Sequence, residues 1–392
     1  MNMEGRITIE LQRGSDGYAR PDIRSNRPVH ASNVFHGKSV EQSISTIPLL
    51  FSVCGTAHSC AAVRGCEQAM GIDTKPLLDK VRERLVEMET IREHLWRALL
   101  EWSEIMKIPP DRGSIARIIS LQRQYQTAIG SGISPFQIGS DIPKPNYDQL
   151  HSIQREYLSI LSQSLFGGSV RDWLGIENIP MMKQWLEDVD TTTARLLRSI
   201  ASSDWSSAGR CAIEPLPEMR VDELDRKLMD LGYIEQPLWH GDPCETTSRT
   251  RTSSPLLDAL HSEYGNGLLV RILSRITELA QLVVKMDRLE FPANPTKPPP
   301  SPSPQSGIGR SEAARGLLIH RVEVNGHTVV RYQILAPTEW NFHPQGVVAR
   351  ALGTLHMDSP DLQTVAEMII NAIDPCVGYD LTINTLAATN QK

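Results

Sequence analysis

The sequence has few cysteines, no excess of positive charge and no uninterrupted hydrophobic run, and each absence excludes a class of protein. Six cysteines in 392 residues are too few for a disulfide scaffold and favour a reducing compartment. A net charge of -6, from 40 Lys+Arg and 46 Asp+Glu, argues against a nucleic-acid partner. The most hydrophobic stretch, residues 267–291, carries Arg271, Glu278 and Lys285 and so predicts an amphipathic helix instead of a membrane span. No Sec-type signal pattern is present, so we expect a cytoplasmic protein without membrane insertion.

The hydrophobic pattern predicts a mainly helical protein with a small β component. Hydrophobic residues make up 40% of the chain, which is enough for a large core. Ile7, Ile9 and Leu11 alternate with polar residues and predict a short strand. Apolar residues at helical spacing predict helices over residues 75–106, 111–129, 147–165, 180–202, 256–289 and 362–373.

A proline-rich segment divides the chain. Residues 292–308 hold seven prolines, which predicts an exposed linker in the polyproline II conformation. After it, two alternating segments flank Asn325-Gly326 and predict a β-hairpin with a type I′ turn. We therefore expect an N-terminal strand and helical body over residues 1–291, and a hairpin with a C-terminal helix over residues 309–392 that packs onto the body as one unit.

A cysteine and a histidine four residues apart are the first candidate for chemistry. The segment reads Cys54-Gly-Thr-Ala-His58-Ser-Cys60, and Cys66 follows. A thiolate and an imidazole at this spacing can bind a transition metal or form a nucleophile–base pair. The spacing is not that of a zinc site, and by itself it favours buried structural cysteines and a capping histidine. His320 matches no recognisable pattern, and we expect it to be structural.

Three further segments follow the Cys54 motif along the chain: Glu312-Ala-Ala-Arg315-Gly316, Pro337-Thr338-Glu339-Trp340-Asn341 and Asp374-Pro375-Cys376. The order of these four motifs resembles the large subunit of the nickel–iron (NiFe) hydrogenases. That family carries Arg-x-Cys-Gly-x-Cys-x-x-x-His, Glu-Ala-Pro-Arg-Gly, Pro-Thr-x-Trp-Asn and Asp-Pro-Cys-x-x-Cys-x-x-His in this order. The resemblance implies the same fold, a helical body with small β elements near both termini whose two ends meet at a metal site.

Half of the family's metal ligands are missing. Each Cys-x-x-Cys pair has lost its second cysteine, because Ala57 and Tyr379 stand in those positions, and Thr382 replaces the last histidine. The family's acidic residue near the start is replaced by Lys38-Ser39. Two thiolates cannot give nickel four sulfur ligands and also bridge it to iron. The sequence therefore argues against a hydrogen-cycling nickel–iron centre, and we expect no nickel.

The residues that remain are those a single iron would need. The resemblance implies that Cys54 and Cys376 supply thiolates to the iron, with His58 as a candidate third ligand. It also implies a pocket for the cyanide ligands of the iron. Its residues are Arg315 and Thr338, which would each donate a hydrogen bond to a cyanide, and Pro337, which would hold Thr338 in place.

A degenerate large subunit of this kind is similar to the HupK/HoxV group of hydrogenase maturation proteins. The similarity implies a non-catalytic scaffold that transiently holds an Fe(CN)2(CO) unit for transfer to the apo large subunit. It implies as partners the small hydrogenase maturation chaperone, the iron-assembly complex and the apo large subunit itself. Two alternatives stay open: a divergent catalytic large subunit, and a metal-free chaperone of the large subunit.

Overall fold

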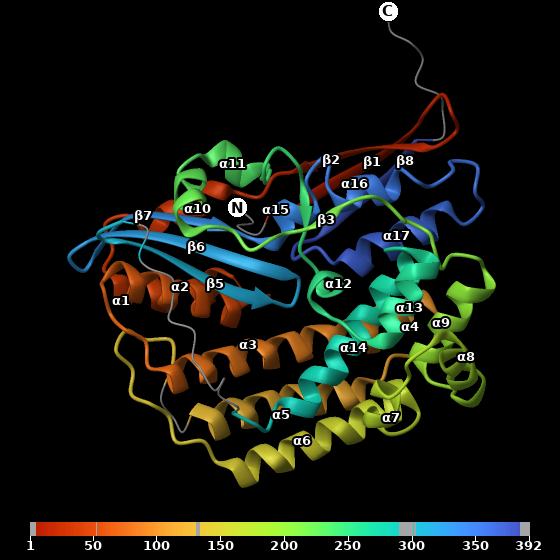
Figure 1. Ribbon diagram of the computed structural model, residues 1–392, viewed down its shortest axis with the longest axis horizontal. Helices are drawn as coiled ribbons and strands as arrows, with labels where there is room; N and C mark the ends of the chain where they lie inside the picture. The colour runs from red at the N-terminus through yellow and green to blue at the C-terminus, as the bar shows by residue number, and fades with distance from the viewer. Residues whose placement is uncertain (1–4, 52, 131–133, 290–300, 302, 385–392) are drawn as a thin grey trace, which may run out of the picture.

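A mostly helical body carries two small sheets in the computed structural model, which describes residues 5–51, 53–130, 134–289, 301 and 303–384. One sheet lies over the first helices of the chain, and the other joins the two ends of the chain (Figure 1). The helices of the first half are α1 (Val40–Leu50), α2 (Gly55–Ala69), α3 (Pro76–Trp96), α4 (Trp102–Ile105), α5 (Arg112–Gly130), α6 (Tyr147–Leu161), α7 (Val170–Leu174), α8 (Ile179–Asp188) and α9 (Thr192–Ser202), with a 3-10 helix, η1 (Val29–Phe35), before them and π turns η2 (Arg97–Glu101) and η3 (Ser162–Phe166) among them.

The second half of the chain adds shorter helices around one long buried one. This long helix, α14, runs through the body between the sheets and the lower helices (Figure 1). The helices are α10 (Val221–Leu228), α11 (Leu231–Glu235), α12 (Ser248–Arg251), α13 (Pro255–Tyr264), α14 (Leu268–Lys285), α15 (Pro337–Asn341), α16 (Val347–Leu352) and α17 (Leu362–Ile373), and a two-residue strand pair joins β3 (Glu214–Pro215) to β4 (Cys244–Glu245).

Two of the segments predicted as single helices are each divided into two helices in the structure. The pattern over 180–202 is interrupted before Thr191, whose hydroxyl accepts a hydrogen bond from the N–H of Ala194 and starts α9. The pattern over 256–289 is interrupted at Gly265, which has φ +63° and no room for a Cβ, since that atom would lie 2.6 Å from Nε of Arg210. The apolar spacing continues across both breaks, which is why periodicity alone joined the helices.

Three of the four charged residues of α14 are not on a solvated face, contrary to the amphipathic helix that the sequence predicts. Arg271, Arg275 and Glu278 are all buried. Arg271 pairs with buried Glu245 in β4, and Glu278 pairs with Arg251 in α12. Buried charges are tolerated when they are paired and hydrogen bonded. Most of the helix is therefore enclosed by the body, and its buried charges connect it to neighbouring segments, whereas Lys285 near its C-terminal end is exposed.

The sheet above the first helices has the order β5-β6-β7, built from β5 (Ser306–Ala313), β6 (Gly316–Asn325) and β7 (Thr328–Leu335). The predicted hairpin is confirmed as β6 and β7, but its turn is not type I′. Gly326 and His327 form the turn, and of these only Gly326 has a positive φ, as in a type II′ turn. Strand β5 begins inside the segment expected as a linker, of which residues 292–300 and 302 lie outside the described residues.

Glycines let strand β5 lie directly on helix α2. A Cβ on Gly309 would lie 1.8 Å from the carbonyl oxygen of Ala61, and one on Gly307 would lie 2.1 Å from that of Gly65. No side chain fits between the two backbones at these points. The contact matters for the site because α2 begins at Cys54 and β5 leads into Arg315.

The second sheet joins the two ends of the chain in the order β2-β1-β8 (Figure 1). The predicted first strand is confirmed as β1 (Ile7–Arg13), which pairs antiparallel with β2 (Ala19–Ser25). Strand β8 (Tyr379–Asn384) pairs with β1 in parallel, with Ile7 opposite Tyr379. This pairing places the segment around Cys376 beside the N-terminal half of the body.

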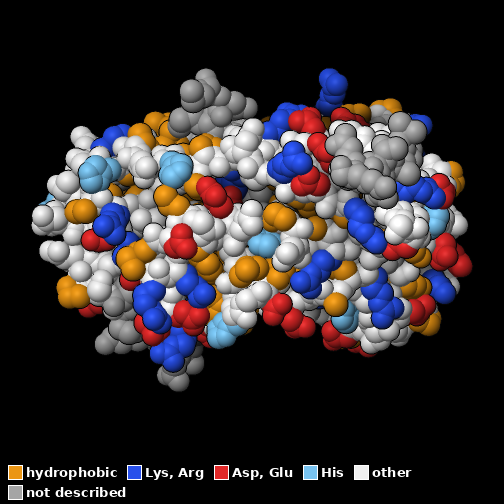
Figure 2. Space-filling model, turned by 90° about the horizontal axis from the view of Figure 1, so that it is seen from above, with side chains coloured by type: hydrophobic (Ala, Val, Ile, Leu, Met, Phe, Trp, Pro, Cys, Tyr) orange, Lys and Arg blue, Asp and Glu red, His pale blue; other side chains and the backbone are white. Residues whose placement is uncertain are grey.

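The described helices and the face seen in Figure 2 bear on two expectations from the sequence. Within the described residues, no helix has the length and apolar character needed to cross a bilayer. On the face in Figure 2, basic and acidic side chains are interspersed over the two lobes.

Candidate metal-binding pocket

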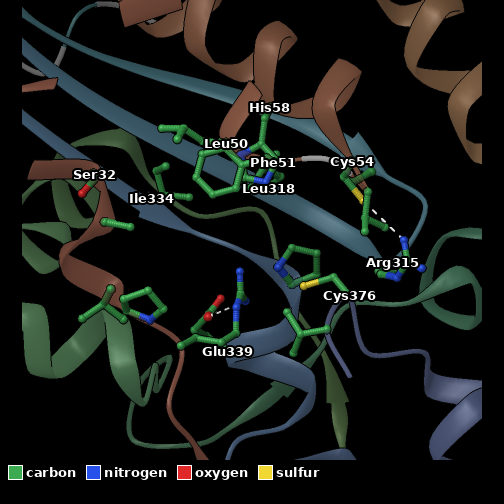
Figure 3. Close-up of a pocket in the computed structure, with 18 residues that line it drawn as sticks. Ser32, Leu50, Phe51, Cys54, His58, Arg315, Leu318, Ile334, Glu339 and Cys376 are labelled. Atoms are coloured by element: carbon green, nitrogen blue, oxygen red, sulfur yellow. Dashed lines mark hydrogen bonds and ion pairs between the residues drawn. The ribbon is translucent and has the colours of Figure 1, made fainter. Parts of the chain in front are cut away.

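A pocket lies between η1, the start of α2, the β5–β6 turn and α15 (Figure 3). Cys54, Cys376 and Arg315 are at one end of it, and Ser32, Leu50 and Ile334 line the other. The structure thus brings together residues that are more than 320 positions apart in the sequence. Its lining residues are Arg27, Pro28, Val29, Ala31, Ser32, Leu50, Phe51, Val53, Cys54, His58, Ala313, Arg315, Leu318, Ile334, Pro337, Glu339, Cys376 and Val377.

Cys54 occupies the N-cap position of α2, but its side chain does not cap the helix. The carboxylate of Glu89 in α3 accepts the N–H groups of Thr56 and Ala57 instead, at 2.9 and 3.0 Å. The sulfur is therefore left to face the pocket. Burial raises the pKa of the Cys54 thiol to about 12, against the opposing effect of the Arg315 charge. The free thiol is protonated at neutral pH, and a metal would have to displace that proton.

Arg315 sits in the tight turn between β5 and β6 and is buried. Its Nη1 donates to the Cys54 sulfur at 3.4 Å, and its other N–H groups reach Glu93 and Asp374 at 3.2 Å. The turn needs Gly316, which has φ +131° and no room for a Cβ beside the carbonyl of Thr246. Burial alone would lower the pKa of Arg315, but the charges of Asp374, Cys54 and Glu93 raise it overall, so the guanidinium stays charged.

Asp374 sets the direction in which the chain approaches Cys376. It follows α17 with φ +72°, a left-handed conformation that is uncommon for a residue other than glycine. Its carboxylate pairs with Arg97 at 2.6 Å, Arg315 at 3.2 Å and Arg275 at 3.5 Å. Burial would raise the pKa of Asp374, but the three arginines hold it well below its usual range. These contacts stabilise the turn that places Cys376 at the pocket.

Thr338 contacts the second cysteine. Its hydroxyl oxygen lies 2.9 Å from the Cys376 sulfur. Pro337 is the first residue of α15, a position that suits its fixed φ, and it lines the pocket next to Thr338. Each of the two pocket cysteines thus has one neighbouring hydrogen-bond partner, Arg315 for Cys54 and Thr338 for Cys376.

His58 lines the pocket from α2 and is held from behind by two other buried rings. Its Nδ1 lies 2.9 Å from Nε2 of His320, and Nδ1 of His320 lies 2.7 Å from the hydroxyl of Tyr332. The ring of Phe51 stacks on His58 at 3.9 Å. His320, expected to be structural, is therefore in direct contact with a pocket residue.

Sequence reasoning missed three charged residues at the pocket. Arg27 and Glu339 form an ion pair of 2.6 Å inside it, and Glu93 bonds Arg315. Arg27 is 312 positions from Glu339, so no local pattern could have connected them. Glu339 lies within a recognised motif, but at its variable position.

The other predicted cysteines stay outside the pocket. Cys60 and Cys66 are buried on α2 among apolar side chains and do not line it. None of the six cysteines, all within the described residues, forms a disulfide. In the part of the chain that the structure describes, no three His, Cys, Asp or Glu side chains are grouped as a metal site. The pocket offers two thiols and a set of hydrogen-bond donors, which suits a metal that brings its other ligands with it.

This helical body with its two small sheets is the fold of the nickel-dependent hydrogenase large subunits. It superposes on the Ni-Fe-Se hydrogenase of Desulfomicrobium baculatum with a TM-score of 0.65 at 14% identity, covering 96% of this chain and 97% of that one. The Ni-Fe-Se hydrogenase of D. vulgaris Hildenborough gives a TM-score of 0.62 at 15% identity, with 93% and 94% covered. The family model "Nickel-dependent hydrogenase" matches residues 266–379.

Nearly the whole chain resembles proteins named for hydrogenase formation. The hydrogenase expression/formation protein HupV of Azotobacter chroococcum is 28% identical over 97% of this chain and 99% of its own length. HoxV of Cupriavidus necator is 28% identical over 92% of both chains, and HupK of Azotobacter vinelandii is 26% identical over 97% and 99%. The expected similarity to the HupK/HoxV group is confirmed.

Proposed function

We propose that this chain is a non-catalytic scaffold in NiFe-hydrogenase maturation, holding an Fe(CN)2(CO) unit between Cys54 and Cys376 for transfer to the apo large subunit. The observation that carries the proposal is the pocket itself, where the two cysteines and Arg315 lie at one end. The names of the relatives support a role in hydrogenase formation.

The donor set suits a cargo that carries negative ligands. A guanidinium has five N–H donors, and the contacts of Arg315 with Cys54, Glu93 and Asp374 use four of them among the described residues. The remaining donor is available to a cyanide nitrogen, and a charged donor in a dry pocket makes a strong bond to such a ligand. The Thr338 hydroxyl lies beside Cys376, where it can serve a second cyanide.

The number of thiols suits temporary holding. Two thiolates can retain a low-spin iron whose other positions are filled by diatomic ligands, and they release it more easily than four would. Nickel in the related enzymes needs more sulfur than this pocket provides. The partners that would deliver and accept the unit are the maturation chaperone with its iron-assembly complex, and the apo large subunit.

Infrared spectroscopy of protein purified anaerobically with the maturation machinery tests the proposal. We expect CN and CO bands together with iron, and their loss in the double variant Cys54→Ser, Cys376→Ser. The matched control is Cys211→Ser, Cys244→Ser, which removes two thiols that do not line the pocket and should keep the bands. Bands that survive the first double replacement, or are absent from the native protein, contradict the proposal.

Elemental analysis of the same samples separates the two alternatives. About one nickel per chain would favour a divergent catalytic large subunit and overturn the scaffold. Iron-free protein that still binds the apo large subunit would favour a metal-free chaperone and overturn the iron-holding role.

A further inference from the structure

Three buried side chains form a hydrogen-bonded row that ends at the pocket. Tyr332 in β7 contacts His320 in β6 at 2.7 Å, and His320 contacts His58 in α2 at 2.9 Å. All three are at most 5% exposed. Within the described residues, the Tyr332 hydroxyl has no hydrogen-bond partner besides His320, and Nε2 of His58 has none. The row therefore has one end closed in the core and the other facing the pocket.

Both rings are neutral, so each carries a single N–H. Both rings are buried and in contact with each other, and among the described residues no carboxylate is hydrogen bonded to either. Burial therefore lowers the pKa of His320 to about 3, and burial with the nearby Arg27 charge lowers the pKa of His58. A neutral imidazole has one donor nitrogen and one acceptor nitrogen. The proton positions along the row are therefore coupled: once the donor in one contact is known, the donor in the other contact is known as well.

The contact with Tyr332 decides in which direction the hydrogen bonds along the row are donated. A phenol is a good donor and a weak acceptor, and among the described residues its hydroxyl hydrogen has only Nδ1 of His320 to bond. When Nδ1 of His320 accepts, its Nε2 carries the hydrogen and donates to Nδ1 of His58. The remaining hydrogen of His58 must then be on Nε2. The opposite direction would leave the phenol hydrogen buried without an acceptor.

We propose that Tyr332 and His320 fix His58 in its Nε2–H form, so that the pocket presents a hydrogen-bond donor, and not a metal-binding lone pair, to an anionic occupant. Phe51, stacked on the His58 ring at an interplanar angle of 7°, holds that donor in one orientation. On this proposal His58 is not the third iron ligand. Because His58 then offers no lone pair to a bare divalent cation, the row disfavours bare cations beside His58 and favours a complex with negative ligands. Only the identity of that complex depends on the proposed function.

Nitrogen NMR of metal-free protein labelled with 15N-histidine tests the proposal directly. The ring nitrogens report which atom carries the hydrogen, and the His58→Gln variant assigns the His58 signals. We expect Nε2–H for His58 in the native protein, and a mixture of both forms in Tyr332→Phe, because the direction is then no longer fixed. The control Tyr18→Phe removes an exposed hydroxyl and should change nothing. A native His58 with its hydrogen on Nδ1 overturns the proposal, even if the variant does not fold.

Cobalt binding gives a second measurement. Once His58 can turn its lone pair toward the pocket, Tyr332→Phe should bind Co2+ about tenfold more tightly than the native protein, with an added nitrogen ligand in the absorption spectrum. Equal affinity in both proteins contradicts the proposal. Neither measurement uses the iron unit. The proposal for His58 can therefore be refuted while the infrared bands are still observed, and the infrared bands can be absent while the proposal for His58 holds.

Discussion

Replacing Arg315 with methionine removes a buried guanidinium but keeps most of its apolar stem. Breaking one side of a buried ion pair costs about 3–5 kcal/mol, since the partner charge is left unpaired. Here both carboxylates keep another arginine: Glu93 retains Arg92 at 2.7 Å, and Asp374 retains Arg97 at 2.6 Å. We therefore expect Arg315→Met to lower the free energy of unfolding by about 3 kcal/mol, at the lower end of the range for a broken buried ion pair.

Urea unfolding followed by circular dichroism measures this loss. The matched control is Arg24→Met, in which the replaced side chain is 69% exposed and the loss should stay below about 0.5 kcal/mol. A loss for Arg315→Met as small as that of the control would refute the reasoning, because it would mean that the arginine is not part of the folded network. A loss above about 5 kcal/mol would mean that Arg92 and Arg97 do not compensate.

Three further outcomes follow from the packing and the buried groups. Gly309→Ala should destabilise the protein by about 1–3 kcal/mol in urea unfolding, because its Cβ meets the backbone of α2, whereas Gly168→Ala, with open space around it, should not. Asn341→Ala should cost about 1–3 kcal/mol, since its amide bonds the backbone of Arg315 and that of the β4–α12 loop; unchanged stability would show these bonds to be replaceable by water. The pKa of His320, about 3 in the folded protein, lies below its ordinary value, so protonation favours unfolding. Its contribution to stability is complete above about pH 6.5 and is lost as the pH falls toward 3, at up to about 1.4 kcal/mol per pH unit, and His320→Gln should show a shallower slope in pH-dependent unfolding.

The sequence indicated the candidate metal-site residues through motifs, and the order of these motifs along the chain was enough to suggest the fold. Cys54, Arg315, Thr338 and Cys376 each stand in a short recognisable segment. The structure places all of these segments around one end of one pocket. Their role with a metal remains a prediction that the infrared experiment tests.

Residues without a motif could not be found in this way. His320 and Tyr332 are in the predicted hairpin, but only the packing of β6 on α2 brings them behind His58. The same holds for Arg27 and Glu339, which pair across 312 positions. A pattern along one chain records spacing within an element, and these contacts are between elements.

The sequence by itself determined the helical character, the hairpin and the absence of half the cysteines of the NiFe-hydrogenase motifs, because periodicity and residue identity are local properties of the chain. The tertiary structure alone decided that α14 buries Arg271, Arg275 and Glu278 and that Asp374 meets three arginines. It also decided that the His58 ring lines the pocket and that the rings of His320 and Tyr332 lie behind it. The physical reason is that burial, pairing and proton position depend on what lies across the gap between elements, and only the folded chain brings those groups together.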